Sequence, residues 1–557
     1  MAERGGDEGG IARRTFIAGG TAALTVTALT PGIAAARPKR APETDPVVRT
    51  TAGALRGTRN GAVSVFRGIP YAQPPVGPLR FSSPRPPKPW QGVRDAVDYG
   101  PTAIQFQGTE GQEDCLYANV WTPGTRGARP VLVFIHGGGW QSGAGSLPNY
   151  ESSRLAERGD LVVVTFNYRL GAFGWGLHEE FADPSTGSIA NWGLQDQAAA
   201  LRWLRANAAA FGGDPDNITV SGGSAGGATT WQLSLLPQTR PLIRRIIPIS
   251  PAHIWTPAAA LTPQDARRAY ELVAKDLGVT VSKLREVPAY ALRDSWEKLF
   301  AGSPADRPLA SGRAYRGPVI DGEWMRGPLH RLPVPELPTL SINTDTEGSF
   351  YTGPNPPTPA PAPTPTDEAS LRVAVRAVLI KGAVQVTDAE VDACIAAYRA
   401  AAIADGLPHD PLSLWTEIWG DGLFRYLAVR LAEKQARAGV VPQYRMEFAH
   451  PVRAPWFGTP HEATSKFLFG SFKLPANAPQ YGDGPLEETV SNAFMDLVAS
   501  FAHTGAPAVD TVRHWPVFDP ARATALRLGG PDVARLVTTS KARQLSYWDT
   551  AGWGPRP

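Results

Sequence analysis

Cysteine is nearly absent from this chain, which carries only Cys115 and Cys394 among its 557 residues. Two cysteines cannot form the framework of bridges that stabilises small disulfide-rich extracellular domains, so that class is excluded. Apolar residues make up 43% of the sequence and charged residues 19%, which is an ordinary balance for a protein with a buried core. One disulfide bridge and two free thiols are both compatible with the sequence.

The sequence also lacks any concentration of one charge. Its 55 Lys and Arg residues nearly balance 51 Asp and Glu residues, and the net charge of +4 contains no basic block. Nucleic acid is therefore not an expected partner. No segment beyond the N-terminal region is apolar enough to cross a bilayer, so we expect no membrane anchor in the mature protein. Gly (57) and Pro (54) are abundant, which predicts many turns and long connections.

The N-terminus has the features of an export signal. Arg13 and Arg14 form a twin-arginine pair, and an apolar stretch follows as far as Ile33. Ala34–Ala36 then offers a small-residue cleavage site. The stretch is rich in Ala, Thr and Gly and is short for a membrane span, which disfavours a permanent anchor. We predict that residues 1–36 are a bacterial twin-arginine signal peptide and that the mature protein is secreted.

Short, unbroken apolar runs recur in the first half of the mature chain. Such runs are typical of strands that are covered on both faces, as in a parallel sheet. They are Val131–Ile135, Leu161–Val164, Ile218–Val220 and Ile246–Ile247. Helical patterns separate them, for example over Gln195–Asn207. This alternation of strands and helices predicts an α/β fold around a central, mostly parallel sheet.

Two helical blocks follow, over about 261–337 and 367–439, and we predict that both are insertions on one sheet within a single domain, residues 37–557. Strand-like segments at Pro338–Asn343 and Gln443–Phe448 come after them and would extend that sheet. Between the blocks, Pro354–Pro365 contains seven prolines and should be extended. It is either a plain surface loop or a segment that shapes the entrance to a site.

A candidate nucleophile lies in Gly222–Gly226, which matches the pattern G-x-S-x-G around Ser224. The pattern alone is weak evidence, but the strand-like Ile218–Val220 precedes it and a helical pattern over Ala225–Leu233 follows it. A strand, a sharp turn and a helix are the setting of the nucleophile elbow in α/β-hydrolases. Ser224 is therefore the predicted nucleophile.

A glycine-rich loop, His136-Gly137-Gly138-Gly139, directly follows the apolar run Val131–Ile135. Lipases and esterases place such a loop where its backbone N–H groups face the substrate carbonyl. We predict that the N–H groups of Gly138, Gly139 and Ala225 form an oxyanion hole, with His136 anchoring the loop. No Lys-Ser/Thr follows the glycines, which argues against a phosphate-binding loop. Trp140 is a candidate pocket wall, although it could equally be a packing residue.

The acid and the base are each ambiguous from pattern alone. The chain order of an α/β-hydrolase is Ser, acid, His. Asp345 and Glu347 both stand at the carboxyl end of the predicted strand Pro338–Asn343, where ligand crevices open. His450 and His461 both follow the predicted strand Gln443–Phe448, and the loop around His461 slightly favours that residue. Either carboxylate satisfies the chemistry of a catalytic triad.

Several longer motifs resemble the type-B carboxylesterases, the family of cholinesterases and bacterial p-nitrobenzyl esterases. The resemblance extends from about Phe66 to Phe518. It rests on Phe66–Ala72, Pro74–Gly77, Glu113–Tyr117, Asn119–Trp121, Asn167–Gly171 and Phe211–Pro215, together with the elbow. It implies that Glu347, ahead of Gly348-Ser349-Phe350, is the acid and that His461, nine residues before Gly470, is the base. It further implies a supporting role for Ser250 and a structural ion pair between Arg80 and Glu113.

Two departures from the family pattern stand out. The family usually has Glu before the nucleophile, whereas this chain has Gly223. We expect this loss of a carboxylate to alter the pH dependence or to lower turnover. The family usually pairs the cysteine of the Glu113–Tyr117 segment with an upstream cysteine, but Ala103 occupies that position here. Cys115 is therefore expected to lack its partner.

The sequence thus predicts a serine hydrolase that cleaves small to medium carboxylic esters through an acyl-enzyme, without metal or cofactor. Thioester or amide cleavage, or lipase activity, with the same triad is an alternative. A non-catalytic binding module related to the cholinesterases is an alternative of another class, and the filled triad positions disfavour it.

Overall fold

The computed structural model describes residues 45–106, 110–252, 262–300, 317–327, 331–354, 356, 362–382, 386–512 and 514–551. Residues Asp45–Pro557 form one compact unit. The predicted signal peptide, residues 1–36, lies outside the described residues, as does half of the proline-rich stretch Pro354–Pro365. Within the described residues, no helix is both long enough and apolar enough to span a membrane.

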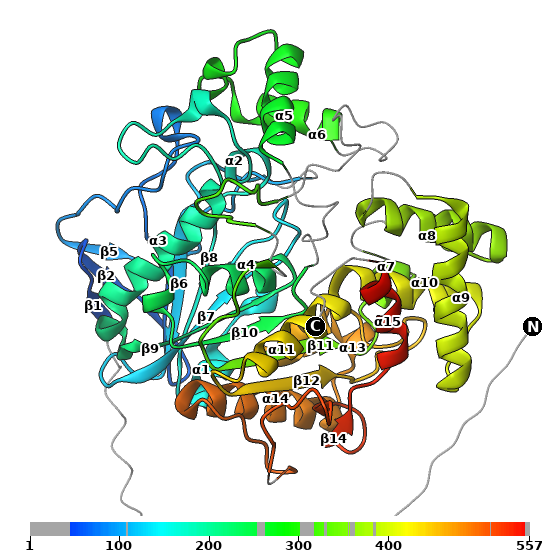
Figure 1. Ribbon diagram of the computed structural model, residues 1–557. Helices are drawn as coiled ribbons and strands as arrows, with labels where there is room; N and C mark the ends of the chain where they lie inside the picture. Colours follow the sequence, from blue (N-terminus) through cyan, green and yellow to red (C-terminus); the bar gives the residue numbers. More distant parts are fainter. Residues whose placement is uncertain are drawn as a thin grey trace, which may run out of the picture. The chain divides into compact units, whose positions relative to one another are not determined.

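Two sheets are present in the described residues (Figure 1). The small N-terminal sheet is three-stranded and consists of β1 (Val47–Arg49), β2 (Ala54–Arg56) and β5 (Val93–Asp95). The large sheet contains β3 (Thr58–Asn60), β4 (Val63–Pro70), β6 (Tyr117–Thr122), β7 (Arg129–Ile135), β8 (Val162–Phe166), β9 (Gly213–Gly223), β10 (Arg245–Ile249), β11 (Thr339–Thr344), β12 (Gln443–Phe448), β13 (Thr524–Leu528) and β14 (Ala534–Thr538).

The large sheet is 11-stranded and mixed, with the order β14-β13-β12-β11-β10-β9-β7-β8-β6-β4-β3. Every neighbouring pair from β8 across to β13 is parallel. The pairs at both edges are antiparallel. The parallel centre brings the carboxyl ends of β7, β9, β10, β11 and β12 to the same edge, where α/β folds place their sites. The strands predicted from the apolar runs therefore lie in a mostly parallel central sheet, as the sequence predicts.

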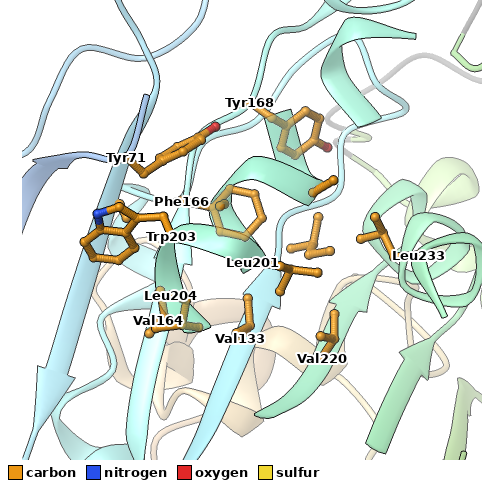
Figure 2. Packing of buried hydrophobic residues seen from close by; sticks show 14 of the residues in the cluster. Tyr71, Val133, Val164, Phe166, Tyr168, Leu201, Trp203, Leu204, Val220 and Leu233 are labelled. Atoms are coloured by element: carbon orange, nitrogen blue, oxygen red, sulfur yellow. The ribbon is translucent and has the colours of Figure 1, made fainter. Parts of the chain in front are cut away.

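The central strands are apolar throughout because both faces of the sheet are covered. In β7, Val131, Val133 and Ile135 lie in one apolar core, whereas Leu132 and Phe134 lie in a second core on the opposite face. Figure 2 shows the first of these cores, in which Val133, Val164 and Val220 pack against Leu201 and Leu204 of a covering helix. The unbroken apolar runs follow from this arrangement, since neighbouring side chains point to opposite faces.

Helices form the layers on both faces. α3 (Trp192–Asn207), α4 (Ala225–Leu233) and α11 (Tyr426–Ala438) contribute to the first core, and α1 (Ser153–Gly159), α12 (Ala463–Leu468) and α14 (Pro485–Thr504) to the second. The remaining α-helices are α2 (Gly171–Gly174), α5 (Pro263–Asp276), α6 (Ala289–Phe300), α7 (Ser349–Thr352), α8 (Glu368–Gly382), α9 (Asp388–Ala404), α10 (Pro411–Gly420), α13 (Ala478–Tyr481) and α15 (Ala542–Thr550).

The described part of the first helical insertion contains less helix than the sequence predicts. α5 begins as expected, with the Thr262 hydroxyl accepting from the Asp265 N–H at the N-cap, and α6 ends at Phe300. Residues 317–327, however, form turns without a helix, so the predicted helical block to 337 is wrong there. Pro318 and the glycines at 317, 322 and 327 disfavour helix in that stretch. α5 and α6 pack against residues of the preceding chain, such as Phe81 and Trp192, in a third apolar core that contains Tyr270 and Trp296.

The second insertion contains α8, α9, α10 and α11, and their apolar faces form a further separate core. Thr387 forms a capping box with Glu390 at the start of α9, and Gly439 ends α11 in the left-handed conformation (φ 66°). Both helical blocks are therefore packed in apolar cores separate from those of the central sheet, and each core includes residues from other parts of the chain.

The family-specific structural expectations hold in this fold. Arg80 and Glu113 form a bidentate ion pair, with Nε–Oε1 and Nη2–Oε2 distances of 2.6 Å. Cys115 and Cys394 are both buried and free, so the disulfide alternative is wrong. Ala103, where the family partner of Cys115 would stand, pairs by a β-bridge with Gln112 instead.

Candidate active site

Ser224 occupies the turn between β9 and α4, at the carboxyl end of a central strand. Its backbone has φ 58° and ψ −120°, a strained conformation for a residue with a side chain. The turn is held because the Ser224 N–H donates to the Ile249 carbonyl of β10 at 3.0 Å. The Ala252 N–H in turn donates to the Ser224 carbonyl at 3.0 Å. This strand–turn–helix is the arrangement of a nucleophile elbow.

The glycines of the elbow are required by close backbone contacts. A Cβ at Gly226 would lie 2.1 Å from the Ile135 carbonyl oxygen, and a Cβ at Gly222 would lie 2.6 Å from the Gly226 carbonyl. A Cβ at Gly223 would instead meet only Phe134 Cζ, at 3.8 Å. Gly223 is therefore not required by space, although it replaces the carboxylate that relatives carry.

Glu347 and His461 form a buried hydrogen-bonded pair. His461 Nδ1 and Glu347 Oε2 lie 2.6 Å apart. His461 is 5% exposed and Glu347 is 2% exposed. The other carboxylate oxygen, Oε1, accepts from the Ser250 hydroxyl at 2.6 Å and from the Thr344 N–H at 2.7 Å. Both carboxylate oxygens are thus occupied, which fixes the orientation of Glu347 and of the imidazole it holds.

The structure separates the two candidate acids. Asp345 points to a basic pair instead of a histidine: its Oδ1 lies 3.0 Å from Arg527 Nη1 and its Oδ2 lies 3.6 Å from Lys541 Nζ. Burial raises the pKa of Asp345, and Lys541 and Arg527 more than offset that effect, so the pKa lies below its usual range. Asp345 is part of an ion-pair cluster beside the loop that carries Glu347.

The structure also separates the two candidate bases. His450 Nδ1 accepts the Gly530 N–H at 3.3 Å, and its Nε2 lies 3.7 Å from Glu487 Oε1. Burial lowers the pKa of His450, against the opposing effect of Glu487. His450 therefore contacts groups other than those that surround Glu347. In the part of the chain that the structure describes, no hydrogen bond yet joins His461 to Ser224, a contact that frequently tightens only when substrate binds.

The three predicted oxyanion donors are backbone N–H groups that have no acceptor among the described residues. Among the described residues, none of the N–H groups of Gly138, Gly139 and Ala225 donates a hydrogen bond. Gly138 is exposed and Gly139 half-buried, so the loop is open to a ligand. The loop also lies against Ser224, because a Cβ at Gly137 would lie 3.0 Å from Ser224 Cβ. Unpaired N–H groups beside a nucleophile can stabilise a developing oxyanion.

His136 anchors this loop from inside the protein. It is fully buried, its ring stacks on Tyr168 with centroids 4.3 Å apart, and the Tyr168 hydroxyl donates to the His136 carbonyl at 2.9 Å. Burial lowers the pKa of His136 to about 4, against a raising effect from the Gly137 carbonyl. Trp140 is also buried, 1% exposed, and packs edge-on against Trp175. These contacts support packing roles for both residues.

One neighbour of the site was not indicated by the sequence. The ring of Phe424 stacks on the imidazole of His461, with centroids 3.8 Å apart and planes at 27°. Phe424 belongs to η9, a π-helix over Asp421–Arg425 that continues α10. No motif marks such a residue in the sequence. Among the described residues, no cluster of His, Cys, Asp and Glu is arranged to hold a metal ion.

A strained serine turn beside open backbone donors, on a sheet of this topology, defines the class of serine hydrolases with the α/β-hydrolase fold. A sequence model of the Carboxylesterase family matches residues 44–548, and the chain belongs to that family. It is a carboxylic ester hydrolase that depends on a serine nucleophile.

Individual relatives agree with this family. The chain is 33% identical to the phenmedipham hydrolase of Pseudarthrobacter oxydans, over 88% of this chain and 97% of that one. It is 32% identical to the para-nitrobenzyl esterase of Bacillus subtilis, over 85% of this chain and 93% of that one. A solved carboxylesterase of Geobacillus stearothermophilus has a TM-score of 0.73 and 30% identity, covering 90% of this chain and 99% of that one.

Proposed function

We propose that Ser224, His461 and Glu347 are the catalytic triad of this esterase and that the N–H groups of Gly138, Gly139 and Ala225 form its oxyanion hole. The observation that carries the proposal is the buried hydrogen bond between His461 Nδ1 and Glu347 Oε2, 2.6 Å long. With Nδ1 engaged in this way, Nε2 is the ring nitrogen left to exchange a proton with Ser224.

The reaction then has two half-steps. Ser224 Oγ attacks the ester carbonyl while His461 Nε2 takes the hydroxyl proton, and the negative charge that develops on the carbonyl oxygen is stabilised by the three N–H groups. His461 gives the proton to the leaving alcohol, which leaves an acyl-Ser224. Water then repeats the sequence and releases the acid. Glu347 stabilises the imidazolium, and the Ser250 hydroxyl, 2.6 Å from Oε1, keeps the carboxylate in place.

We propose small to medium carboxylic esters as the substrates. Names among the relatives, such as para-nitrobenzyl esterase, support esters with an aryl-bearing alcohol as a starting panel. The panel should vary the acyl chain and should include long-chain triglycerides, a thioester and an amide. A clear preference for triglycerides would recast the protein as a lipase.

The test of the triad is covalent labelling of purified protein with a fluorophosphonate probe, followed by mapping of the adduct. We expect one adduct, on Ser224, and no labelling of Ser224→Ala. Glu347→Gln and His461→Gln should lower kcat by about 10³-fold or more, because triad members act as a unit. Asp345→Asn and His450→Gln are matched controls that should retain most of the activity. Absence of label on Ser224 in the wild type would refute the proposal.

We also propose that residues 1–36 direct twin-arginine export and that the remainder is a single secreted catalytic domain. The proposal rests on Arg13, Arg14 and the apolar stretch that follows them. In a bacterial host, ester hydrolysis should be found outside the cytoplasm for the wild type and inside it for a variant with both arginines changed to Lys. Equal extracytoplasmic activity of the two proteins would exclude this route.

A further inference from the structure

The helical segment next to His461 is irregular at the point of contact. α10 ends at Gly420, the π-helix η9 follows over Asp421–Arg425, and α11 then continues. A π-helix adds a residue to a helical turn, and such turns are frequent at functional sites. The irregular turn here carries Phe424, whose ring covers one face of the His461 imidazole.

The contact between the two rings is close and buried. Their centroids are 3.8 Å apart at 27°, and Phe424 is 3% exposed while His461 is 5% exposed. Phe350 also contacts His461, edge-on, at 6.0 Å. The rotation of the imidazole is therefore restricted by the Phe424 ring on its face and by the hydrogen bond between its Nδ1 and Glu347.

The same segment closes on the loop that carries Glu347. A Cβ at Gly348 would lie 1.9 Å from the Thr416 carbonyl oxygen of α10. A Cβ at Gly420 would lie 2.6 Å from the Gly348 nitrogen and 3.1 Å from Glu347 Cβ. The end of α10 thus touches the acid, and the π-turn that follows touches the base, so a single element spans both.

Buried polar contacts hold the π-turn in place. Arg425 and Asp421 form a bidentate ion pair, with Nε–Oδ1 and Nη2–Oδ2 distances of 2.5 and 2.8 Å. The Tyr398 hydroxyl donates to Asp421 Oδ2 at 2.7 Å, and Arg425 Nη1 donates to the Ser540 carbonyl at 3.0 Å. Asp421 and Arg425 are 2% and 1% exposed. A turn fixed in this way gives Phe424 little freedom to move.

We propose that Phe424, held by the π-turn, is a positioning residue for His461; this inference rests on the proposed triad. Its ring limits the rotation of the imidazole, so that Nε2 faces Ser224 while Nδ1 stays on Glu347. Its π-face also favours the imidazolium that exists during each proton transfer. Because a small misplacement of a catalytic group costs a large factor in rate, Phe424 contributes to kcat without touching the substrate.

The test compares Phe424→Leu and Phe424→Met with Phe181→Leu. Met keeps most of the volume and lacks the ring, so it preserves the test if the Leu variant folds poorly. Phe181 is a matched control because it is also buried and stacks on Phe81 with centroids 4.2 Å apart at 28°, within the core of α5 and α6. Each protein is titrated with a fluorophosphonate, and kcat and KM are expressed per labelled Ser224.

We expect both Phe424 variants to lose about 10- to 100-fold in kcat per labelled site, with KM within about twofold of the wild type. Phe181→Leu should lose stability without this loss of kcat. A kcat per labelled site within about twofold of the wild type would overturn the proposal. A raised KM with unchanged kcat would do the same, since it would assign Phe424 to substrate binding. Failure of the wild type to label Ser224 would instead refute the triad itself.

Discussion

The three glycines around Ser224 differ in how much space their backbone leaves for a side chain. Gly222 and Gly226 are required because backbone atoms occupy the space of a Cβ, the nearest at 2.6 and 2.1 Å. Gly223 has its nearest neighbour, Phe134 Cζ, at 3.8 Å, which is ordinary van der Waals contact. Space for a Cβ therefore exists at Gly223, the position at which the family pattern usually has Glu.

Gly223→Glu should therefore fold and should restore a negative charge beside the site. Because a nearby carboxylate favours the imidazolium, we expect the acid limb of the kcat/KM profile to move to higher pH by about 1 unit. Gly223→Ala is the steric control and should leave the limb where it is. Gly226→Ala, in contrast, should disrupt the elbow. The measurement is kcat/KM from pH 4 to 9, and an unmoved limb in Gly223→Glu would contradict the expectation.

His136 gives the protein a pH-dependent stability. Its pKa is about 4 in the folded state, against an ordinary value near 6.5. The unfolded chain therefore binds a proton first as the pH falls, which stabilises the unfolded state. Stability is full above about pH 7, falls by on the order of 3 kcal/mol as the pH drops to 4, and then levels off for this group.

His136→Asn should lack this component of the pH dependence. Denaturant unfolding at pH 7, 5.5 and 4 would measure it, with the loss of unfolding free energy between pH 7 and 4 smaller in the variant. Equal losses in the two proteins would show that His136 is not the group responsible. The variant should also have reduced activity, because the glycine loop loses its anchor.

At the scale of elements, the two carboxylates in the loop after β11 have different partners. Glu347 turns toward His461, whereas Asp345 turns toward Arg527 and Lys541. Lys541 also donates to the Asp345 carbonyl at 2.7 Å and to Glu417 at 2.8 Å. Asp345 therefore ties the acid-bearing loop to α10 and to the chain before α15, and its role is in stability.

Asp345→Asn should cost about 1–3 kcal/mol of unfolding free energy at neutral pH, because Arg527 and Lys541 each lose one charged partner. A carboxylate with a lowered pKa stabilises the fold above its unfolded pKa, near 3.9. That contribution disappears as the pH falls through the folded pKa. The difference between wild type and variant should thus be constant from pH 6 to 8 and shrink below about pH 4. Loss of kcat comparable to Glu347→Gln would contradict the division of roles.

Elements with a local signal could be predicted from the sequence, and those set by tertiary contacts could not. The apolar runs of β7, β8 and β9 and the start of α4 at Ala225 followed from residue pattern. Asp345 and Glu347 could not be separated by pattern, because both follow β11 and only packing decides which one meets His461. Phe424 was missed because the extra residue of a π-turn changes the helical phase, and no residue type marks that change.

At the scale of the whole molecule, the parallel centre of the sheet explains why distant segments form one site. Ser224 follows β9, Ser250 follows β10, Glu347 follows β11 and His461 follows β12, so four neighbouring strands each deliver one residue to the same edge. Three of these residues are hydrogen-bonded in their chain order, Ser250 to Glu347 and Glu347 to His461. The helical insertion between β11 and β12 adds the π-turn behind this row.

The fold needs no disulfide bridge, and its stability should not depend on redox conditions. Cys115 and Cys394 are buried and free. The pKa of each thiol is raised, and burial contributes most to that shift. A raised pKa leaves little thiolate, the reactive form, so both thiols should be inert in the folded protein. This suits the proposed export route, in which the chain folds in a reducing compartment before it crosses the membrane.

We expect the same melting temperature with and without dithiothreitol. A thiol reagent such as dithionitrobenzoate should modify no cysteine in the native enzyme at pH 8 and both after unfolding in guanidinium. Cys115→Ala and Cys394→Ala would assign any native reactivity to one site. A lower melting temperature in reductant, or a denatured protein with no titratable thiol, would show that the two cysteines are bridged. The chain would then have to be oxidised after export, which contradicts folding before it.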